Sequence, residues 1–176
     1  MEVSKPRRVN PHSARILMEL AAREYVDEND RSKALDARLT LLVPITAAAI
    51  LFVGGILARP LGTLQPFASG IHFSGVCLAA AFLLGAQACF IRALKTRDFQ
   101  RMGLGEWART LNMEAPAADA RAELASLYET AAANNSLIND KKTQFYETGL
   151  ILASAGVLIL AVTLGWAAAA AQLFPA

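Results

Sequence analysis

Three long intervals of this chain contain no charged side chain, and they constrain its fold more than any other feature. No Asp, Glu, Lys or Arg occurs at positions 39–58, 60–91 or 148–176. Because a helix rises about 1.5 Å per residue, about 20 apolar residues cross the roughly 30 Å hydrocarbon core of a bilayer. Each interval is long enough, which excludes a soluble single domain. The expected fold class is an all-α integral membrane protein with three transmembrane helices plus cytosolic helices.

The charged residues indicate which side of the membrane each end occupies. All 17 basic residues except Arg59 fall at positions 1–38 or 92–148, and all 15 acidic residues lie in the same two segments. Cytoplasmic flanks of membrane helices are enriched in Lys and Arg. We therefore expect a multi-pass protein with a cytoplasmic N-terminus and with its C-terminus outside.

This topology divides the chain into six segments. They are a cytosolic basic tail and helix at 1–38, a first transmembrane helix at 39–58, a short outer loop at 59–70, a second transmembrane helix at 71–91, a cytosolic helical region at 92–148, and a third transmembrane helix at 149–174.

Local signals refine the ends of these segments. Asn10 and Pro11 predict a helix start, since Asn caps helices and Pro suits the first helical position. That helix either lies near the headgroups or runs directly into the first span, and the acidic residues at 27–30 favour a cytosolic stalk. Pro66 and Gly70 predict turns in the outer loop. Residues 104–111 predict a short amphipathic helix, and Asp119 a cap for the helix after it.

The long cytosolic helix before the third span has a polar interruption in its apolar stripe. A near-heptad spacing relates Leu124, Leu127, Ala131, Ile138 and Phe145, and Asn135 and Lys142 fall on the same stripe. Polar residues in such a seam set register or oligomer state at some cost in stability. Alternatively, an anionic ligand or a partner binds the polar, cationic patch formed by Asn135, Asn139, Lys141 and Lys142.

Within the apolar intervals, Pro44 predicts a packing kink or, as the sharper alternative, a gating hinge. Small residues recur four apart, as at Gly75 with Ala79 and Gly149 with Ala153. Such pairs permit close helix packing, within a protomer or in a homo-oligomer. No Asp, Glu, Lys or Arg lies in the spans, which disfavours ion-coupled transport. A passive pore would need several protomers, and Thr46, Gln87 and Ser154 are the candidates for lining it.

Catalytic and metal chemistry is not evident in the sequence. His12 and His72 lie on opposite predicted sides, and Cys77 and Cys89 are about 18 Å apart along one helix. No phosphate-binding loop, nucleophile elbow or suitable carboxylate pair occurs. We therefore expect no enzymatic activity, no catalytic residues, no metal site, no cofactor and no nucleic-acid partner. The lipid bilayer is the first expected partner.

Two short patterns beside the spans carry a resemblance to a known family. The first is Arg31, Leu35, Asp36 and Arg38 before the first span, and the second is Asn135, Asn139 and Lys142 before the third. The layout resembles small bacterial membrane effectors of nucleotide-signalled antiphage defence, namely the transmembrane effectors of Pycsar systems and SLATT-type proteins.

That resemblance implies an inner-membrane effector that is silent until a nucleotide second messenger or a partner protein alters its cytosolic helices. It would then assemble and permeabilise the bacterial inner membrane. No separate cyclic-nucleotide-binding domain is visible in the sequence. The alternatives are a membrane anchor or scaffold that recruits a soluble partner, and a holin-like stress protein.

Overall fold

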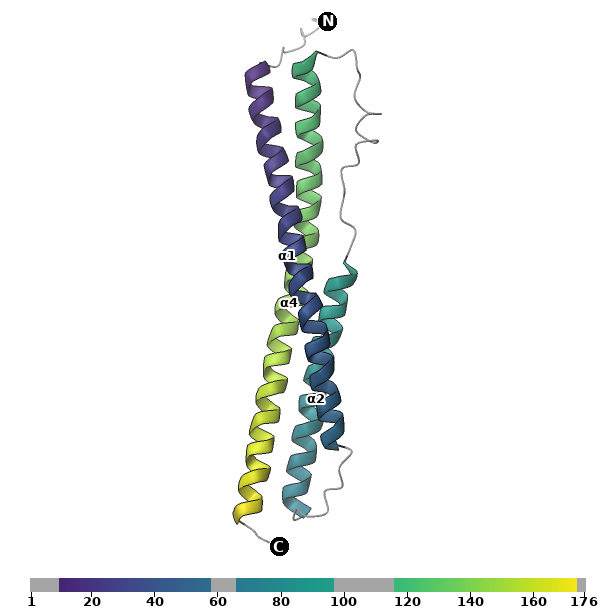
Figure 1. The fold of residues 1–176 in the computed structure, drawn as a ribbon, viewed down its shortest axis with the longest axis vertical. Helices are drawn as coiled ribbons and strands as arrows, with labels where there is room; N and C mark the ends of the chain where they lie inside the picture. Colours follow the sequence, from purple (N-terminus) through teal and green to yellow (C-terminus); the bar gives the residue numbers. More distant parts are fainter. Residues whose placement is uncertain (1–9, 58–65, 97–115, 174–176) are drawn as a thin grey trace, which may run out of the picture. The chain divides into compact units, whose positions relative to one another are not determined.

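The computed structural model describes residues 10–57, 66–96 and 116–173, and all regular secondary structure in these ranges is α-helical (Figure 1). The helices are α1, Pro11–Leu57; α2, Pro66–Lys95; and α4, Ala117–Leu173. Each is long and apolar enough to cross a membrane, in agreement with the three charge-free intervals. The tail at 1–9, most of the outer loop and the expected helix at 104–111 lie outside the described residues.

The helix α1 begins where the sequence predicts. The main-chain N–H of His12 donates to Oδ1 of Asn10 at 3.0 Å, and Pro11 is the first helical residue. The helix then continues through Pro44 to Leu57, a total of 47 residues. Of the two alternatives for the N-terminal helix, direct continuation into the first apolar interval is the one found.

Two other helix starts differ from the predictions. Pro66 and Gly70 lie inside α2, because a proline at the first helical position loses no helical hydrogen bond. Asp119 lies in the first turn of α4 and is not its cap. The carbonyl of Pro116 instead accepts hydrogen bonds from the N–H groups of Asp119 and Ala120, at 2.9 and 3.1 Å.

The chain divides into two compact units. The first combines Met1–Ala34 with Arg97–Asp140, and the second combines Leu35–Thr96 with Lys141–Ala176. Both α1 and α4 contribute their first part to the first unit and their remainder to the second. The helix α2 belongs to the second unit alone.

In the first unit, α1 and α4 lie side by side and run in the same direction (Figure 1). The rings of Tyr25 and Tyr128 lie 5.6 Å apart between centroids. The buried positions of α4 in this unit are small or polar, namely Ala125, Ala131, Ala132, Asn135 and Asn139. Leu124, Leu127 and Ile138 are only half-buried. Ala131 and Asn135 of the expected stripe thus lie in the seam, whereas its larger members flank the seam. Small side chains let the two backbones approach.

In the second unit, α1, α2 and α4 pack around two apolar clusters. One contains Leu39, Ala86, Phe90 and Ala93, and the other contains Val53, Val76 and Leu83. Buried positions of α2 alternate three and four apart, the spacing of coiled-coil seams. Phe90 packs against Gly149, and Leu83 against Gly156. Because residue numbers fall along α2 as they rise along α4, these two helices are antiparallel.

Candidate functional site

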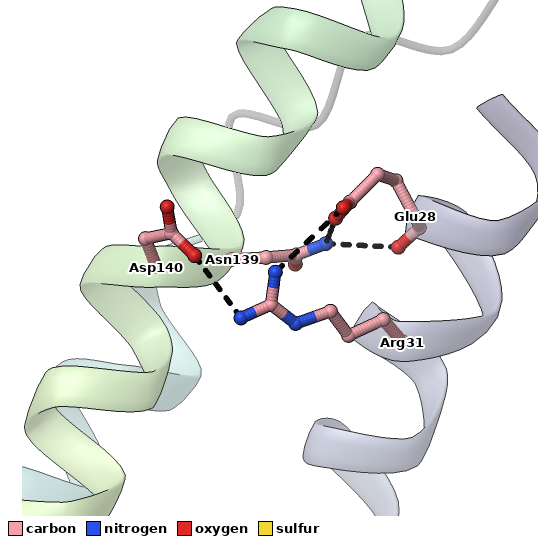
Figure 2. A network of polar contacts seen from close by, with 4 residues as sticks. All are labelled: Glu28, Arg31, Asn139 and Asp140. Carbon is pink, nitrogen blue, oxygen red and sulfur yellow. Dashed lines mark hydrogen bonds and ion pairs between the residues drawn. The ribbon is translucent and has the colours of Figure 1, made fainter. Parts of the chain in front are cut away.

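Four polar side chains join α1 to α4 within the first unit (Figure 2). Nδ2 of Asn139 donates to the main-chain oxygen of Glu28 at 2.8 Å and to its carboxylate oxygen Oε2 at 2.7 Å. Nη2 of Arg31 donates to Oδ1 of Asp140 at 3.0 Å, and Nη1 lies 3.6 Å from Oε1 of Glu28. Glu28 therefore connects the buried amide to the outer ion pair, and we name these four residues the polar clamp.

The clamp has a buried layer and an exposed layer. Asn139 is fully buried, whereas the side chains of Arg31 and Asp140 are 42% and 55% exposed. Leaving a buried amide without its hydrogen bonds costs about 1–3 kcal/mol, whereas an exposed ion pair contributes about 0–1 kcal/mol. Asn139 and Glu28 therefore carry most of the energy of this contact, and Arg31 and Asp140 mainly define its geometry.

Helical spacing explains why these residues meet. Asn135 and Asn139 are four apart on α4 and share one face, and both are fully buried. On α1, Glu28, which contacts Asn139, is half-buried, and Ser32 is buried one turn later. Hydrogen bonds hold this seam where a coiled coil normally has Leu or Ile. A polar seam of this kind fixes the register of the two helices. Separating them exposes less apolar surface than separating a seam of Leu and Ile would.

The second unit contains an ion pair of its own. Nζ of Lys142 lies 2.8 Å from Oδ1 of Asp36. The Lys142 side chain is 2% exposed and that of Asp36 is 46% exposed. The carboxylate therefore reaches water while the ammonium does not. Burying an ammonium is tolerated only when a counter-charge and hydrogen bonds compensate for the lost solvent, so Lys142 depends on Asp36.

These contacts show where the four residues of the predicted anion site lie. Asn139 bonds to Glu28, Lys142 bonds to Asp36, and Asn135 is buried in the α1–α4 seam. Lys141 alone is exposed. Their burial agrees with a role in setting register. Anion binding by Asn139 or Lys142 stays a prediction and would require the ligand to displace a carboxylate of this chain.

Sequence reasoning did not identify Glu28, Arg31, Asp36 and Asp140 as partners of the Asn and Lys residues. The only hint of these contacts in the sequence is that the acidic and basic side chains lie on two helices that are both expected to be cytosolic. It could not give the pairing, because Glu28 and Asn139 are 111 positions apart.

The proposed pore-lining residues do not share one environment. Thr46 is 5% exposed, and its hydroxyl lies within hydrogen-bond distance of the Leu42 and Val43 carbonyls, at 2.9 and 3.1 Å, and of Oε1 of Gln87. The structure thus brings Thr46 and Gln87 together inside the second unit. Ser154 is exposed on α4, where it lines a shallow groove with Ala153, Val157, Leu158 and Ala161.

Pro44 is exposed and lies within the unbroken helix α1, so a hinge at this position stays a prediction. Cys77 and Cys89 are free and half-buried. Within the described ranges, no three His, Cys, Asp or Glu side chains gather where they could hold a metal ion. No family model matches this chain, and comparisons with curated proteins and with solved structures find no match either.

Proposed function

We propose that this protein is an oligomeric effector of the bacterial inner membrane, which disrupts or gates the membrane in antiphage defence. The apolar helices of the second unit would cross the membrane, with the N-terminus in the cytoplasm and the C-terminus outside. The first unit would receive the signal on the cytoplasmic side. One observation carries this proposal: α1 and α4 each continue without a break from the clamp-bearing unit into the apolar unit.

The composition of the first unit supports a role as receiver. Its α1–α4 seam is held by the polar clamp and by alanines, with few large apolar side chains. Such a contact has two accessible states, because hydrogen bonds lost on separation are replaced by bonds to water. A nucleotide second messenger or a partner protein that binds the separated state would shift the equilibrium toward it. The resemblance of the sequence to Pycsar and SLATT-type effectors motivates the nucleotide.

The apolar surface of the second unit supports assembly. Only 17–28% of the residues in the three apolar windows are buried inside the protein. Three helices cannot enclose a wide channel, so a pore requires a homo-oligomer. Thr46 and Gln87 bond to each other within one protomer. They would line such a pore only after that bond opens, whereas Ser154 is already exposed.

The clamp gives a direct test of the proposal. Asp140→Arg places two cations together across the seam, which should separate α1 from α4 in the first unit. We expect this variant to depolarise cells without any trigger, as followed with a voltage-sensitive dye, whereas the unaltered protein stays silent without infection or its genomic neighbours. The matched control is Asp30→Arg, which makes the same change of charge but removes the exposed Asp30–Lys33 pair within α1.

An unchanged membrane potential for both proteins under every condition, including infection, would contradict the effector proposal. The control for this result is detection of the protein in the membrane fraction of the same cells. Arg31→Asp combined with Asp140→Arg swaps the ion pair and should restore silence. A double variant as active as Asp140→Arg would show that the ion pair does not control the state.

A membrane anchor for a soluble partner is the second candidate function, and one observation favours it. Leu17 and Leu20 are each 55% exposed on the first unit, where they border a groove rimmed by Glu24, Asp27 and Glu129. Affinity purification in detergent separates the two functions. A second stoichiometric subunit would support the anchor, and a homo-oligomer alone would support the effector. For the holin-like alternative, expression of the protein should lyse cells even when no defence signal is present.

A further inference from the structure

Exposed cations gather at one end of the apolar bundle in the second unit. Arg38, Arg92, Lys95 and Lys141 are all exposed, and they come from all three helices of the unit. Arg38 and Arg92 directly adjoin charge-free intervals of the chain. Lys95 lies four residues after the end of one interval, and Lys141 lies seven residues before the start of another. We name these four residues the basic collar.

The packing of the second unit places the collar on one level. Leu39 and Ala93 belong to the same buried cluster, and Phe145 packs against it. Arg38 directly precedes Leu39, Arg92 directly precedes Ala93, and Lys95 follows the partly buried Leu94. Lys141 is one helical turn before Phe145. The four cations therefore surround the same layer of the bundle.

The collar has little negative charge to neutralise it. The described carboxylates of the second unit are Asp36, which pairs with Lys142, and the exposed Glu147. Within the described residues, no carboxylate lies at ion-pair distance from the four collar cations. In the first unit, Arg15, Arg31 and Lys33 each have a carboxylate partner, whereas Arg23 and Arg121 have none among the described residues. An anion from outside the chain thus has access to the collar.

We propose that the basic collar binds the phosphates of anionic phospholipids. This inference rests on the proposed membrane insertion, because the collar borders the apolar segments and so meets the headgroup layer only if those segments lie in the bilayer. The partly buried Phe145 and Tyr146 pack at the same layer and supply apolar surface for acyl chains. A free phosphate would gain the charge contacts alone, whereas a phospholipid gains both. A phospholipid is therefore the ligand that fits the collar.

The helix dipole provides a competing explanation for part of the collar. Arg92 and Lys95 lie in the last turn of α2, where the free carbonyls of a helix end attract cations. Arg38 and Lys141 lie in the interior of α1 and α4, far from a helix end. Dipole compensation therefore accounts for Arg92 and Lys95 and does not account for Arg38 and Lys141.

The test measures lipid retained by the purified full-length protein. Membranes are extracted in detergent, and bound phosphatidylglycerol and phosphatidylcholine of matched chain length are counted by native mass spectrometry. A cation at an anionic surface changes partition about fivefold. We expect the unaltered protein to retain phosphatidylglycerol at least tenfold over phosphatidylcholine. Replacing the whole collar with glutamine should reduce that ratio to within twofold.

Two control variants separate charge at the collar from total charge and from folding. Glutamine at Arg15, Arg23, Lys33 and Arg121 removes four cations from the first unit, and the preference should persist. Exchange of Lys for Arg and Arg for Lys at the collar keeps the charge and should retain the preference. Inorganic phosphate at millimolar concentration should not displace the lipid. Displacement would show that the collar binds phosphate in general, and it would overturn the assignment of a phospholipid.

The outcomes also separate this inference from the proposed function. Protein that resists alkaline extraction from membranes but retains both lipids equally would overturn the collar alone. Protein released by alkaline extraction would overturn membrane insertion and the collar together. If glutamine at the first-unit cations abolishes the preference as fully as glutamine at the collar, the lipid site is not the collar.

Discussion

The main chain of Gly149 lies directly against the ring of Phe90. A Cβ atom at Gly149 would come within 2.5 Å of ring carbon Cε1, closer than packed side chains tolerate. Phe90 is fully buried in the cluster that joins α1, α2 and α4. The same arrangement recurs one heptad later, where Leu83 packs against Gly156. Glycines on α4 thus receive the larger side chains of α2.

Gly149→Ala should destabilise the second unit by about 1–3 kcal/mol, because an added methyl group in a filled contact forces the ring or the helices apart. Thermal unfolding in detergent, followed by circular dichroism, measures the loss. The control is Gly165→Ala on the same helix, where a Cβ atom meets nothing within 4 Å. That variant should be neutral or gain up to about 1 kcal/mol in helix propensity. Equal effects of the two substitutions would contradict the close contact.

Asp36→Ala should leave the ammonium of Lys142 without its counter-charge and lower the free energy of unfolding by about 1–3 kcal/mol. The cost is moderated because nearly half of Asp36 already faces solvent. Adding Lys142→Met should recover most of the loss, since removal of both charges removes the desolvation penalty. The measurement is a double-mutant cycle in detergent. A double variant as unstable as the sum of both single variants would show that the pair is not coupled.

The sequence was sufficient to predict the helices because the membrane leaves few alternatives. A long charge-free interval that crosses lipid must satisfy its main-chain hydrogen bonds internally, so α1, α2 and α4 follow from the positions of the charges. The cap formed by Asn10 was equally local. The turn predicted at Pro66 is wrong because the same residue type favours both turns and the first position of a helix.

The contacts between helices could not be predicted from local sequence patterns. Hydrophobic periodicity identifies large residues such as Leu124 and Leu127, but the seam of α4 runs through Ala125, Ala131 and Ala132, of which only Ala131 belongs to the predicted stripe. A shift of one residue along the sequence corresponds to a rotation of about 100° around the helix axis. A residue predicted to face the partner helix can therefore lie at the edge of the contact. The burial of Asn139 depends on Glu28, which is 111 positions away, and no spacing rule connects them.

Asn139→Ala should loosen the first unit, because it removes two partly buried hydrogen bonds to Glu28, one of them to the main-chain carbonyl. We expect a local loss of about 1–3 kcal/mol. Hydrogen exchange resolves it: amides at 117–140 should exchange faster, while those at 149–170 stay protected. Leu137→Ala is the control, because Leu137 is 63% exposed on the same helix. Uniformly faster exchange along α4 would instead indicate global unfolding.

His72→Leu should stabilise the second unit. His72 is 7% exposed on α2, and its Nδ1 atom is buried without a hydrogen-bond partner among the described residues. Replacing an unsatisfied polar group with an apolar side chain of similar size removes a penalty of about 1–3 kcal/mol. Thermal unfolding in detergent should show a higher midpoint. His12→Leu, at an exposed position of α1, should leave the midpoint unchanged. A lower midpoint for His72→Leu would mean that Nδ1 binds a water molecule or another copy of the chain.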